Sequence, residues 1–230
     1  MDGEWVLTLL DIILINIILS GDNAVVIALA SRNLAPDHQK KAIFWGTFGA
    51  VALRVVLTFV AVRLLEIPLV QAAGGLLLLY IAWKLLHDDH AGENIRGGTT
   101  LAGAIRTIVV ADVVMSLDNV VAVAGAARGN LAMIIVGLAI SVPLIIWCSR
   151  FLTKLMTRFP ILVWIGAGLL GYSAGEMLVG DPYAGELLEG MLSDFTEALP
   201  FLMGVFFVAY GAAAAYHERR STRRKHKYSR

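Results

Sequence analysis

The sequence has little charge, one cysteine and no histidine inside its long apolar runs. Charged residues make up 16% of the 230 residues, whereas hydrophobic residues make up 58%. A soluble domain of this length is rarely so apolar, so this composition excludes an ordinary water-soluble protein. Because Cys148 is the only cysteine, a disulfide framework and a thiolate cluster for soft metals are both excluded.

The chain also lacks a basic region ahead of its first apolar run, since it begins Met1-Asp2-Gly3-Glu4. A cleaved secretory signal is therefore not expected. Apolar runs recur from Trp5 to Tyr216 instead, and roughly 20 apolar residues in a helix cross a hydrocarbon core of about 30 Å. The pattern predicts an all-α, polytopic membrane protein with a single transmembrane domain over residues 1–216.

Seven transmembrane helices are predicted, with boundaries uncertain by a few residues. The connectors between them hold turn formers or charge, as from Ser31 to Lys41 and from His87 to Thr100. The predicted helices cover approximately residues 6–30, 43–64, 67–86, 102–127, 131–150, 160–179 and 198–216.

The distribution of lysine and arginine predicts the orientation, because cytoplasmic loops beside membrane helices carry an excess of these residues. The tail 217–230 is strongly basic, and the loops after the first, third and fifth helices add further lysines and arginines on the same side. The opposite side carries the acidic stretch from Asp181 to Glu197. We therefore expect a plasma (inner) membrane protein with its N-terminus outside and a basic cytosolic tail. A tail of this kind beside a membrane helix meets anionic lipid far more often than nucleic acid.

Two segments of the chain resemble each other. Residues 16–30 and 112–126 align without a gap, and six of the fifteen pairs are identical, including a shared Ser-x-Asp-Asn pattern that begins at Ser20 and Ser116. Chance similarity of two apolar helices explains matching valines but not this polar pattern. With a small shift, the match continues from Gly74, Tyr80 and Ala82 to Gly166, Tyr172 and Ala174.

The alignment divides the membrane domain into two repeats, at about residues 5–86 and 101–179, followed by a seventh helix at about 198–216. Each repeat has three helices, an odd number, so the second repeat enters the membrane from the opposite side. Inverted repeats of this kind are common in secondary transporters with a central binding site. The sixth helix also has a small-residue face that allows close helix packing, formed by Gly166, Gly168, Gly171 and Gly175.

Carboxylate and carboxamide side chains interrupt the apolar runs. A carboxylate at the centre of a membrane helix costs about 2.5–3.5 kcal/mol on insertion scales, so it is expected to face a cavity, a partner or an ion. Oxygen ligands suit hard divalent cations such as Mg²⁺, Ca²⁺ or Mn²⁺, whereas zinc and copper sites usually include His or Cys. The candidate metal ligands are Asn16, Asp22, Asn23, Asp112, Asp118 and Asn119.

Helix counting at about 1.5 Å per residue places Asp22 and Asp112 at similar depth, and Asp118 near the depth of Asn16. The repeats would then form two related polar stations across the membrane midplane. Arg54 falls near the middle of the second predicted helix, where an unpaired guanidinium would be costly. We expect it to pair with an inward carboxylate, either as a permanent ion pair or as a group that competes with the metal.

The paired segments Ser20-Gly21-Asp22-Asn23-Ala24 and Ser116-Leu117-Asp118-Asn119-Val120 resemble the TerC family of integral membrane proteins. The resemblance covers residues 5–215, is strongest to short bacterial members, and includes Gly171 to Met177. It implies membership of the LysE-like transporter superfamily, with links to manganese efflux, to metal supply for exported enzymes and to tellurite resistance. It also implies that Asp22, Asn23, Asp118 and Asn119 are the metal-binding pairs.

The expected function is export of a divalent metal ion by alternating access, with Mn²⁺ as the transported substrate and no organic cofactor. Protons are a candidate counter-substrate. The chain is expected to lie in the lipid bilayer, and a homo-oligomer is a candidate assembly. The alternative is a membrane partner of the secretion machinery that supplies manganese to exported enzymes. An intramembrane enzyme is a third hypothesis, disfavoured because the chain has no cysteine pair, haem-type histidine pair or nucleophile motif.

Overall fold

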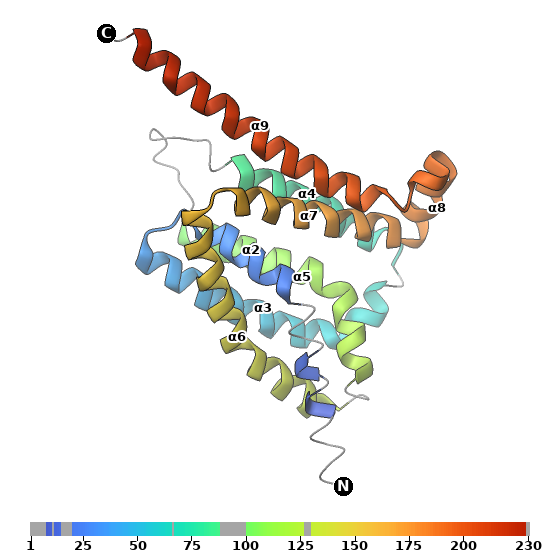
Figure 1. Cartoon of the computed structure of the whole chain (residues 1–230). Coiled ribbons are helices and arrows are strands. Elements are labelled where there is room, and N and C mark those ends of the chain that lie inside the picture. Colours follow the sequence, from blue (N-terminus) through green and yellow to red (C-terminus); the bar gives the residue numbers. More distant parts are fainter. Residues whose placement is uncertain are drawn as a thin grey trace.

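The structure is a computed structural model that describes residues 8–10, 12–14, 20–65, 67–87, 100–126 and 130–228. Within these ranges the regular elements are all helices and no strand occurs (Figure 1). They are α2 (Gly21–Ser31), α3 (Pro36–Leu65), α4 (Val70–His87), α5 (Leu101–Ala126), α6 (Leu131–Arg158), α7 (Ile161–Gly180), α8 (Pro182–Leu192), the 3₁₀ turn η1 (Ser193–Phe195) and α9 (Leu199–Tyr228). The all-α prediction is confirmed for this part of the chain.

Several of these helices have the length and composition of membrane spans. Four segments qualify within the described residues: Pro36–Thr58, Val70–His87, Ala132–Arg158 and Ile161–Gly180. Gly21–Ser31 and Leu199–Ala215 are shorter apolar helices. Large apolar side chains are exposed along the bundle, among them Trp45, Trp147 and Phe206. So much exposed apolar surface is anomalous in water and is expected where lipid covers it.

Helix α2 lies in the interior of the bundle. It contacts α3, α5, α6 and α7, and eight of its eleven residues are buried. Its length is only about 16 Å at roughly 1.5 Å per residue, or about half of the hydrocarbon core. By itself, the described length of α2 is therefore too short to cross the hydrocarbon core.

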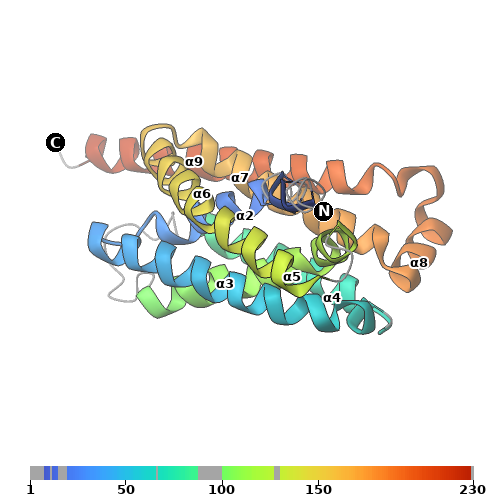
Figure 2. The ribbon, with the colours of Figure 1, turned by 90° about the horizontal axis from the view of Figure 1, so that it is seen from below.

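Glycines bring α7 and α9 into close contact. A Cβ atom at Gly168 would lie 3.0 Å from the Gly204 carbonyl oxygen, and one at Gly204 would lie 3.1 Å from the Gly168 carbonyl oxygen. A Cβ atom at Gly175 would overlap Pro200. Figures 1 and 2 show α9 running alongside α7 in two perpendicular views. The small-residue face predicted for this helix therefore does allow close packing.

Asp181 joins the N-termini of two helices. Its Oδ1 accepts hydrogen bonds from the backbone N–H groups of Tyr183 and Ala184, both at 3.0 Å, and so caps α8. Its Oδ2 accepts from the backbone N–H of Ala72, at 3.2 Å, in the first turn of α4. The residue before α4, Leu69, has no side-chain acceptor, so a carboxylate distant in sequence supplies the cap.

The other end of α4 also has a charged partner. Arg32 is the residue directly after α2, and its guanidinium Nη2 donates a hydrogen bond to the backbone carbonyl of Leu85 at 2.9 Å. Arg32 is buried, with 8% of its surface exposed. A carboxylate thus lies at the positive end of the α4 dipole and a guanidinium at its negative end, and both placements stabilise the helix.

Four predicted boundaries are wrong, and each error has a physical reason. Helix α3 begins at Pro36, inside the predicted connector, because proline is well suited to a first helical turn. Helices α6 and α9 continue to Arg158 and Tyr228, because lysine and arginine side chains allow an apolar helix to extend into the interface. The fourth error concerns residues 182–195, predicted as an acidic connector and found to form α8 and η1.

Helix α8 carries an exposed apolar stripe. Tyr183, Leu187, Met191 and Phe195 recur at four-residue intervals and are 59–73% exposed. The glutamates of α8, Glu186 and Glu189, are exposed as well. Figures 1 and 2 both place α8 at the end of the bundle opposite the C-terminus. A helix with one apolar and one charged face at the end of a membrane bundle suits the water–lipid interface.

Candidate functional site

A buried ion pair joins α3 to α5. Arg54 Nη2 lies 2.6 Å from Asp112 Oδ1, with 3% of the arginine side chain and 8% of the aspartate side chain exposed. The distance is typical of a charge-assisted hydrogen bond. The prediction that Arg54 pairs with an inward carboxylate is therefore confirmed, and its partner is Asp112.

Two serines also form hydrogen bonds with this pair. Arg54 Nη1 donates to Ser20 Oγ at 3.2 Å, and Ser116 Oγ donates to Asp112 Oδ2 at 3.3 Å. Ser20 and Ser116 are the first residues of the two Ser-x-Asp-Asn motifs, and both are buried. Neither serine was among the predicted ligands, although the repeated motif carried the signal that would have identified them.

Asp22 lies beside this pair in the first turn of α2. Its carboxylate interacts electrostatically with both Arg54 and Asp112, and its Oδ1 accepts the backbone N–H of Asn23 at 2.8 Å. The α2 N-terminus adds a partial positive charge that favours an acidic side chain here. The electrostatic interaction relates Asp22 to Asp112, and binding of one cation by both carboxylates stays a prediction.

The side chain of Asn23 has no hydrogen-bond partner. It is 2% exposed, and neither its Oδ1 nor its Nδ2 atom forms a hydrogen bond. A buried carboxamide without partners costs about 1–3 kcal/mol, so an unpaired one in the residue after Asp22 suggests that a ligand supplies the missing contacts. Asn23 was predicted as a ligand, and its Oδ1 is free to bind a cation.

The remaining predicted ligands are not brought together in the described part of the chain. Asn16 lies outside the described residues. Asp118 belongs to α5, but its side chain is also outside the described part. Asn119 is half-buried and has an interaction of its own. The second polar station, predicted from Asp118 and Asn16, therefore stays a prediction.

The described side chains do not form a resident metal centre. Among them, no group of three or more His, Cys, Asp or Glu residues could hold a metal ion. Asp22, Asn23 and Asp112 offer oxygen atoms, but Arg54 occupies part of the coordination space at Asp112.

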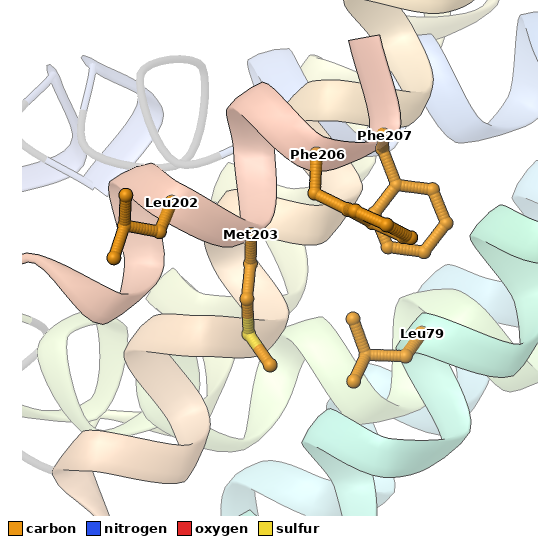
Figure 3. A pocket seen from close by; sticks show the side chains of 5 residues that line it. All are labelled: Leu79, Leu202, Met203, Phe206 and Phe207. Atoms are coloured by element: carbon orange, nitrogen blue, oxygen red, sulfur yellow. The ribbon is translucent and has the colours of Figure 1, made fainter. Parts of the chain in front are cut away.

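An apolar pocket of about 350 Å³ lies elsewhere, where α9 faces α4. Figure 3 shows side chains from both helices around it, with Leu79 opposite the α9 residues. The pocket offers no charged or hydrogen-bonding side chain for a metal ion, and it is separate from the Arg54–Asp112 pair. Its lining residues are Leu79, Leu202, Met203, Phe206 and Phe207.

Comparison with known proteins places the chain among membrane proteins without an assigned activity. It is 49% identical over 181 residues to the uncharacterized membrane protein YjbE of Bacillus subtilis, covering 79% of this chain and 83% of the relative. It is 27% identical to the uncharacterized membrane protein YkoY of the same organism, over 75% of this chain and 61% of the relative. No solved structure matches the chain.

A longer relative matches this chain over less than half of its own length. The UPF0053 inner membrane protein YoaE of Escherichia coli is 26% identical over 212 residues, which cover 84% of this chain but 40% of the relative. The model of the integral membrane protein TerC family matches residues 1–224. With the paired Ser-x-Asp-Asn motifs at a buried ion pair, this match shows that the chain belongs to the TerC family of integral membrane proteins.

Proposed function

We propose that this chain transports a divalent metal ion across the membrane, with Mn²⁺ exported from the cytosol as its substrate. The observation that carries the proposal is the buried Arg54–Asp112 pair, which interacts electrostatically with Asp22. The unpartnered carboxamide of Asn23, the residue after Asp22, supports it. Buried charge of this kind is expensive in a membrane protein and marks ion pathways by default. Asp22, Asn23 and Asp112 would bind the ion, joined by Asp118 and Asn119 from the second motif.

An inverted repeat provides the machinery for alternating access. In this proposal α2, α3 and α4 form one repeat, α5, α6 and α7 form the other, and α9 is the seventh transmembrane helix. If the two repeats are interchanged, α2 corresponds to α5, α3 to α6 and α4 to α7. The α3–α5 contact then corresponds to the α2–α6 contact, and the α4–α5 contact corresponds to the α2–α7 contact. All four contacts are present. This reciprocal pattern supports a two-fold relation between the repeats, which would rock about the site they share.

The choice of ion rests on the chemistry of the ligands. Carboxylate and carboxamide oxygens favour hard cations, and Mn²⁺ accepts such ligands while dehydrating more readily than Mg²⁺ does. The only cysteine, Cys148, is half-buried in α6, outside this site. Zinc and copper, which usually require His or Cys ligands, fit the site less well.

Mn²⁺ flux in proteoliposomes tests the proposal. Wild type should carry Mn²⁺, and Asp22→Asn and Asp118→Asn should each lower the flux at least about tenfold, since each removes a charged ligand. Asp37→Asn is the matched control, because Asp37 is a surface carboxylate with an 88% exposed side chain. Mg²⁺, Ca²⁺ and Zn²⁺ serve as competitors, and Mn²⁺ should win over each at equal concentration.

The same assay separates the transporter from a partner that loads manganese into exported enzymes. A loading partner binds Mn²⁺ but does not need to release it across the membrane. Wild-type protein that binds Mn²⁺ in detergent and shows no flux in liposomes would favour the loading role. Flux that both motif variants retain would contradict the proposed site.

A further inference from the structure

Resting on the proposed function, we infer that the Arg54 guanidinium is a tethered cation that replaces the metal at Asp112 whenever the site is empty. Because Arg54 then neutralises the Asp112 carboxylate, the empty binding site can return across the membrane without a free counter-ion. This assigns a transport step to a residue that would otherwise be a permanent ion pair.

The Arg54 guanidinium contacts oxygen atoms from two different segments, as a bound cation would. Its Nη2 and Nη1 atoms reach Asp112 at 2.6 Å and Ser20 at 3.2 Å. These partners come from α5 and from the residue before α2, whereas Arg54 itself belongs to α3. The guanidinium therefore binds where the motif segments of the two proposed repeats meet, in the position that a transported cation would need.

Charge balance makes Arg54 and the metal alternatives to each other. In their ionised forms Asp22, Asp112 and Arg54 leave one net negative charge. A divalent ion added beside Arg54 would give a net positive charge and place two cations on one buried carboxylate. A divalent ion that displaces Arg54 from the site neutralises both carboxylates, which is the arrangement that a low-dielectric site favours.

The contact also crosses the boundary between the proposed repeats. Arg54 and Ser20 belong to the first repeat, and Asp112 belongs to the second. The ion pair thus links the two proposed repeats, and metal entry would release that contact. Net transport requires the carrier to return empty, whereas exchange of metal for metal does not. Arg54 is therefore needed for net transport but not for exchange of metal for metal.

Arg54→Gln separates these two modes in proteoliposomes with Mn²⁺. Exchange is measured as tracer Mn²⁺ uptake with equal Mn²⁺ on both sides, and net flux with Mn²⁺ on one side only. Exchange should stay within about threefold of wild type, whereas net flux should fall at least about tenfold because the empty site has an unpaired buried carboxylate. The retained exchange also shows that the variant is folded.

Two further variants make the test specific. Arg150→Gln is the matched control, because Arg150 is the exposed arginine 96 positions later, at the offset that relates the two motifs. Arg54→Lys keeps a tethered positive charge at this position, so its net flux should recover relative to Arg54→Gln. Equal loss of both modes in Arg54→Gln, no loss in either, or no recovery in Arg54→Lys would each overturn the inference. Wild type without flux in either mode would instead contradict the proposed function itself.

Discussion

Substitution of Asp181 tests how one carboxylate holds two helices. Asp181→Ala removes the caps of α4 and α8 together. Loss of an N-cap costs about 0.5–2 kcal/mol per helix, so Asp181→Ala should lower the free energy of unfolding by about 2 kcal/mol. For a chain of this size the midpoint of thermal unfolding then falls by roughly 4–8 °C.

Asp181→Asn should have about half of that effect. The carboxamide has a single oxygen, which can accept either from the backbone N–H groups of Tyr183 and Ala184 in α8 or from that of Ala72 in α4. The amide nitrogen then faces the helix that the oxygen does not cap, and two donors point at each other there. The expected fall in the midpoint is about 2–4 °C. Thermal unfolding in detergent measures both variants, and Glu186→Ala, an exposed change on the same helix, is the control. Equal effects of Ala and Asn, or no effect of either, would refute the double-cap argument.

Low pH should destabilise the wild-type protein in the same way as the Asp181→Ala substitution. Burial raises the pKa of Asp181, but the backbone N–H groups of Ala184, Ala72, Tyr183 and Gln71 outweigh it and hold the pKa below its ordinary value of 3.8. A carboxylate with a lowered pKa stabilises the fold fully above the ordinary value and loses this contribution as the pH falls through the lowered one. The difference in stability between wild type and Asp181→Ala should therefore be complete at neutral pH and should shrink below about pH 3.8.

Gly175→Ala should destabilise the α7–α9 contact by about 1–3 kcal/mol, because the new Cβ overlaps Pro200. Gly180→Ala, with no atom within 4 Å of the added Cβ, should unfold like wild type in the same thermal assay, and equal effects would contradict the packing argument. In a Cys148→Ala background, an impermeant maleimide should label Met191→Cys from outside intact cells and Ser221→Cys only from the cytosolic side. The reverse labelling would contradict the proposed orientation.

The sequence predicted the helical membrane class and the Arg54 pair for one shared reason. Burial of charge or of backbone in hydrocarbon is so costly that few arrangements remain. Arg54 had to find an acid near its own depth, and Asp112 was available. The depth estimate, which places Asp22 at the level of Asp112, stays a prediction because it rests on helix boundaries counted from the sequence.

Long-range capping and the interfacial helix were not predictable in the same way. Helix α8 contains acidic residues and glycines, which obscured the four-residue spacing of Tyr183, Leu187 and Met191. Asp181 caps a helix more than one hundred positions earlier, and no local pattern announces such a contact. The partnerless state of Asn23 likewise depends on its neighbours in space, so only the structure shows it.

The charges at the two ends of α4 have a consequence for motion during transport. Asp181 follows α7 and Arg32 follows α2, so α4 is held along its axis by segments attached to two other helices. Sliding α4 by one helical turn, about 5.4 Å, would break both contacts. We therefore expect the proposed rocking of the repeats to proceed without α4 sliding along its own axis, so that α4 can only tilt about its two anchored ends.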